Sequence, residues 1–235
     1  MRYNNIVTGH FISRPNRFIA MVEIDGQEEI CHVKNTGRCR ELLIPGAQLF
    51  LQYSDNPARK TKYDVIGVRK NDLMVNMDSQ VPNKIVCEWL KNGNLFSKNA
   101  NVYPEKTYGN SRFDFYIEDG ERKAFMEVKG VTLEKEGLAR FPDAPTLRGV
   151  KHIQELCECT EHGYEAYILF VIQMKGVYRL EPNWGTHAKF GEALETAEKK
   201  GVRILAYDCQ VTEDSIEIDQ PVPFFLYPEV KHESE

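Results

Sequence analysis

The chain has 235 residues, of which 42% are hydrophobic and 28% charged, and its formal net charge at pH 7 is −5. These values exclude a disordered chain, and the length suffices for one large domain or two small ones. No run of about 18 apolar residues occurs, and the N-terminus lacks an apolar signal segment. We therefore expect a cytoplasmic protein that does not cross a membrane. The six cysteines form no CxxC pair, which argues against a structural zinc site.

The first eighty residues are predicted to form short β-strands separated by turns. The strands are expected at residues 18–24, 29–33, 47–53, 63–69 and 73–76. Asp25-Gly26 is a hairpin signal between the first two, and Pro45-Gly46 interrupts the chain before the third. Five short strands in this length predict a small barrel of the oligonucleotide-binding type (OB fold), which often binds nucleic acid.

Beyond residue 80 the pattern changes to a mixed α/β order. Helices are expected at residues 84–91, 146–162 and 189–200, and strands at 111–117, 124–129, 137–141, 167–172 and 202–207. The continuous apolar run in the fourth of these strands is typical of a strand buried on both faces of a sheet. We therefore predict two domains, an OB-like barrel at residues 1–80 and an α/β domain with an acidic C-terminal segment at residues 81–235.

The negative charge is concentrated at the C-terminal end of the chain. From Asp208 onward eight acids stand against one base, so the preceding residues carry a small net positive charge. Within residues 34–70 eight bases face only three acids, and the bases include Lys34, Arg38 and Arg40. A local basic surface is what phosphate contact requires, although the turns and strand edges of an ordinary soluble domain can have the same composition.

The strands at residues 111–117 and 124–129 carry the candidate chemistry. Successive side chains of a strand point to opposite faces, so Glu127 and Lys129 share a face, and a hairpin between the two strands would let Asp114 reach it. Two carboxylates can bind a divalent cation, Mg²⁺ or Mn²⁺, while the lysine positions a water or stabilises a phosphate. The plainer interpretation is the charged face of a half-buried sheet. Asp114 argues against it, because Asp is depleted in strands.

Two helices supply further candidate residues. In the helix at residues 146–162, an apolar stripe is predicted to be buried, and it consists of Leu147, Val150, Ile153 and Cys157. Arg148, Lys151 and His152 fall on the other side, where they either hold phosphates beside the metal or form a solvated helix face. Glu88 lies at the margin of the apolar stripe of the first helix, where it is either a further metal ligand or plain helix surface.

Five sequence motifs follow one another along the chain. They are Asn35-Thr36-Gly37-Arg38, Leu42-Leu43-x-Pro45-Gly46, Glu127-Val128-Lys129-Gly130-Val131-Thr132-Leu133, Phe141-Pro142-Asp143-Ala144-Pro145-Thr146 and Arg148-Gly149-x-Lys151-His152. In this order they resemble the sugar fermentation stimulation protein A (SfsA) family. The resemblance implies a DNA-binding protein with an OB barrel and a restriction-endonuclease-like domain. The PD-(D/E)xK nuclease pattern of such domains matches Asp114, Glu127 and Lys129, although Arg112-Phe113 stands where that pattern has a proline.

Two functions are therefore open. The first is a metal-dependent nuclease that uses Asp114, Glu127 and Lys129, binds Mg²⁺ or Mn²⁺ through Asp114, Glu127 and Glu88, and contacts DNA through Lys34, Arg38, Arg40, Arg148, Lys151 and His152. The second, also implied by the resemblance, is a DNA-binding transcriptional regulator of sugar (maltose) metabolism whose nuclease-like domain is not catalytic. Clustered acids repel DNA unless a cation lies between them, which favours the first. The sequence makes no prediction of oligomeric state.

Overall fold

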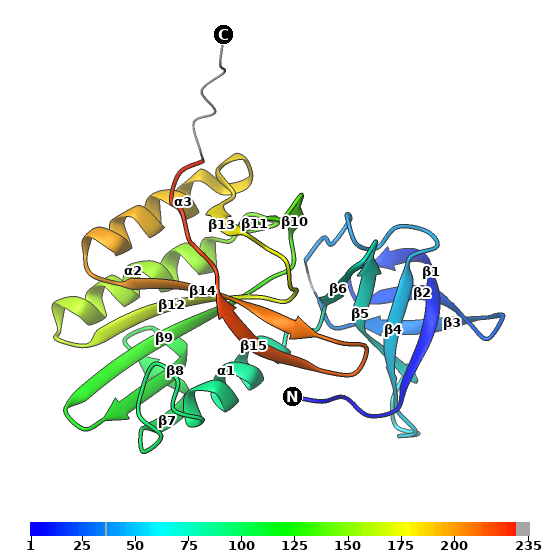
Figure 1. The fold of residues 1–235 in the computed structure, drawn as a ribbon, viewed down its shortest axis with the longest axis horizontal. Helices are drawn as coiled ribbons and strands as arrows, with labels where there is room; N and C mark the ends of the chain where they lie inside the picture. Colours follow the sequence, from blue (N-terminus) through cyan, green and yellow to red (C-terminus); the bar gives the residue numbers. More distant parts are fainter. Residues whose placement is uncertain (36, 229–235) are drawn as a thin grey trace, which may run out of the picture.

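The computed structural model describes residues 1–35 and 37–228, which form a small barrel and a larger α/β part side by side (Figure 1). The strands of the barrel sheet are β1 (Ile6–Asn16), β2 (Ile19–Ile24), β3 (Gln27–Val33), β4 (Gln48–Tyr53), β5 (Tyr63–Lys70) and β6 (Leu73–Asn76). Strand β1 pairs with β2 and β4, and β3 pairs with both β2 and β5, so the first five strands close into a ring. This closure confirms the predicted OB barrel, with β6 added beside β5.

The sequence pattern missed β1. Gly9 and Pro15 interrupt its alternation of apolar and polar residues, and both residue types weaken a strand signal. In the barrel, a Cβ atom at Gly9 would stand 2.7 Å from the carbonyl oxygen of Glu23 on β2. The absence of a side chain at Gly9 therefore permits the close approach of β1 and β2, and the residue that weakens the strand signal is compatible with the closed barrel.

The α/β part is built on a six-stranded sheet. Its strands are β7 (Asn101–Tyr108), β8 (Ser111–Asp119), β9 (Arg122–Val131), β12 (Glu165–Ile172), β14 (Arg203–Val211) and β15 (Ile216–Pro221), in the spatial order β15-β14-β12-β9-β8-β7. Strands β9, β12 and β14 are parallel, and the outer strands are antiparallel to their neighbours. Strands β7 and β15 were not predicted, because each of these edge strands contains a proline, which weakens a strand signal.

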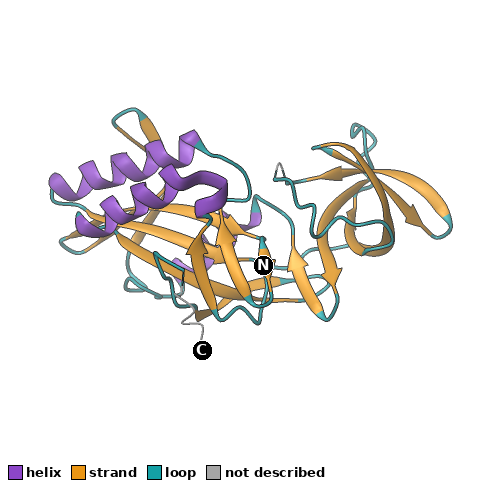
Figure 2. Cartoon of the chain, turned by 90° about the horizontal axis from the view of Figure 1, so that it is seen from above, coloured by secondary structure: helices purple, strands orange, loops and turns teal. Residues whose placement is uncertain are grey.

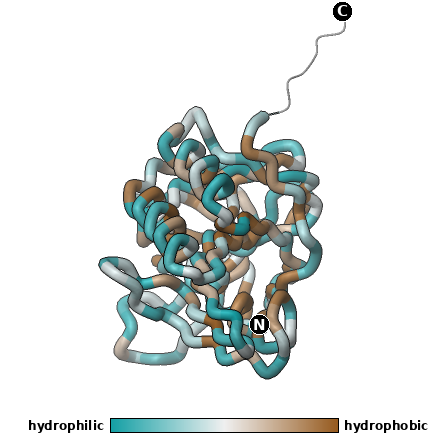
Figure 3. The backbone as a smooth tube through the Cα atoms, turned by 90° about the vertical axis from the view of Figure 1, so that its left-hand side faces the viewer, coloured by the Kyte–Doolittle hydropathy of each residue, from teal (hydrophilic) through white to brown (hydrophobic). Residues whose placement is uncertain are grey.

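Helices cover both faces of this sheet. Helices α2 (Leu147–Glu161) and α3 (Trp184–Lys199) lie side by side on one face (Figure 2), and α1 (Val81–Lys91) packs on the other. The hydrophobic stretches of the chain gather in the interior between these layers (Figure 3). Apolar side chains alternate along β12 between the two sides of the sheet, which explains why its whole sequence is hydrophobic.

A second, three-stranded sheet lies at one end of the α/β part. It consists of β10 (Glu134–Lys135), β11 (Leu138–Phe141) and β13 (Arg179–Pro182). The strand predicted at residues 137–141 therefore exists, but it belongs to this small sheet and not to the sheet of β8 and β9.

Polar contacts join the barrel to the α/β part. Gln173 Nε2 donates to Asn76 Oδ1 at 3.0 Å and to the carbonyl oxygen of Asp78 at 3.1 Å, and Lys70 Nζ pairs with Glu134 Oε2 at 2.7 Å. The domain boundary near residue 80 stays a prediction. No helix of the described residues is long and apolar enough to cross a membrane. The cytoplasmic location likewise stays a prediction.

Candidate functional site

Asp114 lies where the pairing of β8 and β9 ends. The antiparallel register runs from Asp119 opposite Arg122 to Phe115 opposite Met126. One residue further along β8, Asp114 Oδ2 accepts a hydrogen bond of 2.7 Å from the backbone N–H of Val128. Its other oxygen, Oδ1, accepts one of 2.7 Å from Asn83 Nδ2 in the first turn of α1. The carboxylate is therefore held between a helix and the strand that carries Glu127.

Glu127 is 3% exposed and is held by two neighbours. Its Oε1 accepts a hydrogen bond from Lys129 Nζ at 2.6 Å and contacts His152 Nδ1 at 2.5 Å. Arg148 Nε donates to His152 Nε2 at 3.3 Å. Because that contact needs the lone pair of Nε2, the ring proton is on Nδ1 and points at Glu127. A hydrogen-bonded row thus runs from Arg148 through His152 to Glu127.

The start of α2 places His152 in this row. Thr146 adopts an extended backbone and its hydroxyl accepts from the N–H of Gly149 at 3.0 Å, which caps the helix. His152 lies on the second turn, buried with 5% of its surface exposed, and packs edge-on against Phe113 of β8. Helix capping thereby fixes the point at which the imidazole reaches the sheet.

The two carboxylates have opposite pKa shifts. Burial raises the pKa of Asp114, the neighbouring charge of Glu127 raises it further, and the hydrogen bonds from Val128 and Asn83 do not offset these effects. Burial also acts to raise the pKa of Glu127, but the hydrogen bond from His152 and the charge and hydrogen bond of Lys129 outweigh it, so that pKa is lowered. The site thus keeps Glu127 ionised and places Asp114 near it, where the two negative charges would repel each other.

The candidate site offers carboxylate oxygens, the type of donor that a hard divalent cation prefers. Glu127 Oε2 is buried and has no hydrogen-bond partner among the residues that the structure describes, a rare state for a carboxylate oxygen inside a protein. Mg²⁺ typically uses one or two protein carboxylates and completes its octahedron with waters and substrate phosphate. Among the residues that the structure describes, no group of three or more His, Cys, Asp or Glu side chains is arranged to hold a metal. A site of this kind would therefore depend on Asp114, Glu127 and non-protein ligands.

Of the residues predicted to contact DNA, most are exposed. Arg38 and Arg40 follow β3, and Arg148 and Lys151 lie on α2. Lys34 is less available, because its Nζ pairs with Asp64 Oδ2 at 3.2 Å and Asp78 Oδ2 at 3.6 Å. Contact of these bases with DNA stays a prediction.

Two residues lie in surroundings that the helical pattern did not predict, and a third matches one of its two alternatives. His152 was placed on the outward side of its helix but is buried against Glu127. Leu147, assigned to the buried stripe, is exposed at the first residue of α2. Glu88 has a side chain that is 56% exposed, and its Oε2 pairs with the N-terminal ammonium of Met1 at 3.0 Å. Its role as a metal ligand stays a prediction.

Sequence reasoning missed Asn83 as a site residue. The predicted helix begins only at residue 84, one position later, and a neutral amide adds nothing to a charge pattern. A search for polar residues at the first turn of the helix that precedes the Asp…Glu-x-Lys strands could have found it.

Comparisons with known proteins agree with this architecture. The family model described as SfsA N-terminal OB domain matches residues 12–77, and the one described as Sugar fermentation stimulation protein RE domain matches residues 80–215. Two proteins named sugar fermentation stimulation protein homolog are close in sequence. The one from Desulfitobacterium hafniense (strain Y51) is 64% identical over 92% of this chain and 95% of its own length. The one from Clostridium beijerinckii is 60% identical over 96% of this chain and its own full length.

A solved structure has the same fold. The structure of Pyrococcus furiosus SfsA in complex with Ca²⁺ matches with a TM-score of 0.83 and 27% identity, covering 96% of this chain and 98% of that one. Both domains and nearly the whole length are thus shared with relatives of one kind. The chain belongs to the sugar fermentation stimulation protein A (SfsA) family.

Proposed function

We propose that this protein binds DNA and hydrolyses its phosphodiester bonds with a divalent cation, Mg²⁺ or Mn²⁺, held by Asp114 and Glu127. The observation that carries the proposal is the buried Oε2 of Glu127, which has no hydrogen-bond partner among the described residues and lies near the partly buried carboxylate of Asp114. Burying an acceptor without a partner costs about 1–3 kcal/mol, and two neighbouring carboxylates repel each other. A cation between them relieves both costs at once.

Each residue of the site has a distinct role in this proposal. Asp114 and Glu127 supply oxygen ligands, and Asn83 and His152 hold those two carboxylates in place. Lys129, already 2.6 Å from Glu127, provides a positive charge that stabilises the phosphate or orients the attacking water. When bound, the cation would polarise the phosphodiester and lower the pKa of a coordinated water.

DNA binding is supported by the OB barrel and by exposed bases on both parts of the chain. Arg38 and Arg40 lie on the barrel side, and Arg148 lies next to the carboxylates through its hydrogen bond to His152. OB barrels commonly bind oligonucleotides. The Pyrococcus furiosus relative forms a complex with Ca²⁺, a hard cation that prefers oxygen ligands. We therefore assign this chain a DNA partner and an oxygen-ligated divalent cation.

The test is cleavage of labelled DNA by the purified protein with Mg²⁺ or Mn²⁺, compared with EDTA. We expect cation-dependent nicking that Asp114→Ala and Glu127→Ala abolish, while both variants still bind DNA. Glu161→Ala is a matched control, because it removes an exposed carboxylate whose contact is with Lys200. Cleavage that survives both site substitutions would exclude this site.

The alternative is a DNA-binding regulator with a non-catalytic domain. It predicts DNA binding without cleavage under any cation, and binding unaffected by Asp114→Ala. The same experiment therefore separates the two functions.

A further inference from the structure

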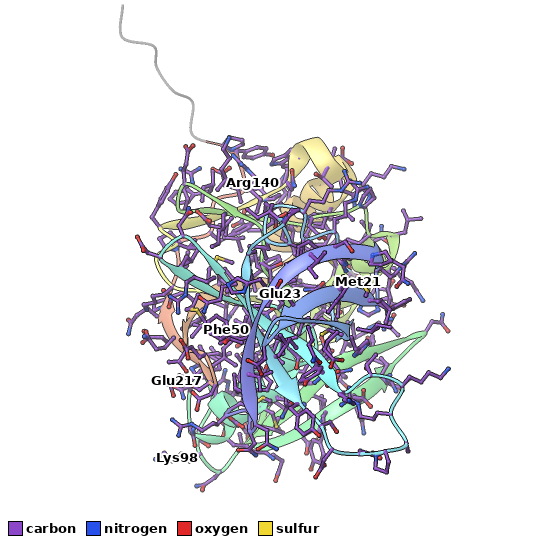
Figure 4. All side chains as sticks on the ribbon, turned by 90° about the vertical axis from the view of Figure 1, so that its right-hand side faces the viewer. Met21, Glu23, Phe50, Lys98, Arg140 and Glu217 are labelled. Carbon is purple, nitrogen blue, oxygen red and sulfur yellow. The ribbon has the colours of Figure 1, made fainter. Side chains whose placement is uncertain are left out.

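A polar cavity of about 190 Å³ lies where the barrel meets the α/β part. Asn35, Gly37 and Ser79 line it from the barrel side, and Gly130, Thr132 and Arg140 from the other. Figure 4 looks along the molecule from the barrel end and shows Arg140 above the barrel strands. Gly130 follows Lys129 directly on β9, so the cavity begins one residue from the candidate site.

Two glycines allow the walls of the cavity to approach each other closely. A Cβ atom at Gly130 would stand 2.5 Å from Gln173 Oε1, and one at Gly37 would stand 2.6 Å from Asp143 Oδ2. Asp143 Oδ2 also accepts a hydrogen bond of 2.9 Å from the backbone N–H of Arg38. The two glycines therefore let the walls approach closely, and Asp143 fastens the barrel loop to the α/β part.

The size and lining of the cavity limit what can enter. Sites for drug-sized ligands usually measure roughly 300–1,000 Å³, so this space suits a single small unit and excludes a duplex. Amide, hydroxyl and guanidinium groups of Asn35, Thr132 and Arg140 supply hydrogen-bond donors and acceptors. The Arg140 guanidinium can pair with a phosphate, since its ion pair with Glu181 is a long one of 3.8 Å. One nucleotide of a DNA strand matches this chemistry.

A chain of contacts connects the cavity with the turn between β1 and β2. The Arg14 guanidinium donates to the carbonyl oxygens of Asn35 at 2.7 Å, Gly37 at 3.0 Å and Arg17 at 2.8 Å. It therefore ties the cavity loop to the β1–β2 turn. On that turn Phe18 is 50% exposed, with the Arg17 guanidinium 5.8 Å from the ring centroid.

An exposed aromatic ring next to a cation is suited to stacking an unpaired base. In OB folds the loop between the first two strands commonly contacts oligonucleotides. Phe18 and the cavity can thus contact one strand of DNA at two places.

We propose that the substrate is single-stranded DNA, with one unpaired nucleotide in the junction cavity beside Lys129 and another base stacked on Phe18. This inference rests on the proposed function, because it places the strand against the Asp114–Glu127 site. It adds that the barrel and the α/β part bind the same strand, and that a duplex must be opened or frayed before it is cut.

The first experiment compares DNA forms. Fluorescence anisotropy in EDTA measures the affinity of the full chain for a labelled 20-nucleotide oligothymidine and for a duplex of the same length. We expect about tenfold tighter binding of the single strand, and faster cleavage of it with Mn²⁺. Equal or tighter binding of the duplex overturns the inference, whatever the cleavage result. Absence of cleavage with retained single-strand preference counts against the proposed function alone.

Single-residue variants test where the DNA strand lies on the protein. Phe18→Ala should weaken single-strand binding about 5- to 150-fold, the range for removal of one stacked base, while Phe18→Tyr should not. Thr132→Phe fills the cavity and Arg140→Ala removes its guanidinium, and both should weaken single-strand binding. Thr132→Ser keeps the hydroxyl without filling the cavity and serves as the control. If Phe18→Ala and Arg140→Ala both leave single-strand binding unchanged in folded protein, checked by circular dichroism, the proposed path is wrong.

Discussion

His152 Nδ1 lies 2.5 Å from Glu127 Oε1, joining a helix and a strand across 25 positions of the chain. The imidazole holds Glu127 from one side while Lys129 holds it from the other. These two contacts fix Oε1 of Glu127, while Oε2 has no hydrogen-bond partner within the described part of the chain. His152 and Lys129 therefore orient the carboxylate of Glu127 so that its Oε2 can bind a ligand.

Removal of the imidazole should impair catalysis through Glu127. Substitution of groups that orient metal ligands typically lowers metal affinity or activity 10- to 100-fold. We expect His152→Ala to reduce Mn²⁺-dependent cleavage by about that factor and to raise the Mn²⁺ concentration needed for half-maximal rate. Lys151→Ala, one residue away but exposed, is the control and should alter DNA affinity only. An unchanged Mn²⁺ requirement in His152→Ala would show that the imidazole does not position Glu127.

A divalent cation should stabilise the fold through Asp114 and Glu127. A ligand at 100 times its Kd adds about 2.7 kcal/mol to the free energy of unfolding, on the order of 5–10 °C in Tm for a chain of this size. We expect Mn²⁺ to raise the Tm of the unmodified protein, measured by differential scanning fluorimetry, and to leave that of Asp114→Asn unchanged.

The same titration decides the role of Glu88. Because its exposed carboxylate pairs with the N-terminal ammonium, we expect Glu88→Gln to keep the full Mn²⁺ shift. Abolition of the shift in this variant would make Glu88 a ligand of the cation, as its position on the first helix suggests.

Arg38 should contribute to DNA affinity without selecting a sequence. Its exposed position after β3 suits phosphate binding. Removal of one phosphate-binding side chain reduces the slope of log K against log salt concentration by about 1. We expect Arg38→Ala to weaken binding to unrelated sequences equally and to flatten the dependence of log K on log salt. Lys34→Ala should have a smaller effect on that slope, because Asp64 and Asp78 already pair with Lys34. Weakening confined to one sequence would indicate base readout by Arg38.

Glu165 should make stability depend on acid pH. Arg122 Nε donates to Glu165 Oε1 at 2.7 Å and Tyr167 donates to Oε2 at 2.5 Å, and these bonds lower the pKa of Glu165 to about 2. Since the unfolded value is about 4.3, the stabilisation is complete above that pH and disappears as pH falls toward 2.

The corresponding variant is Glu165→Gln. In urea unfolding at pH 7 its free energy of unfolding should be about 1 kcal/mol lower, and the difference from the unmodified protein should shrink between pH 4.5 and pH 3. Glu161→Gln, which changes an exposed partner of Lys200, should have little effect at either pH. A difference that stays constant with pH would show that the charge of Glu165 is not the cause.

Much of the architecture could be predicted from local patterns. The hairpin and strand signals located β2 to β6, and the periodicities located α1, α2, β8, β9 and β12, because each depends on neighbours within a few residues. Alternation along β9 likewise placed Glu127 and Lys129 together, and their ion pair follows from a spacing of two residues in a strand. The five ordered motifs are by themselves sufficient to indicate the family.

Tertiary structure decided what surrounds that pair. His152 contacts Glu127, Asn83 contacts Asp114, and Asp143 contacts Arg38, all across long stretches of chain that no periodicity relates. Gly9 likewise shows what local patterns do not predict. It weakens the strand signal in the sequence, yet in the structure it lies where two strands approach closely. Burial of polar groups depends on which segments pack against each other, and that is a property of the completed fold. The sequence alone therefore predicts the family, most of the helices and strands, and the Glu127–Lys129 ion pair. Packing between distant segments leaves Glu127 Oε2 without a hydrogen-bond partner among the described residues.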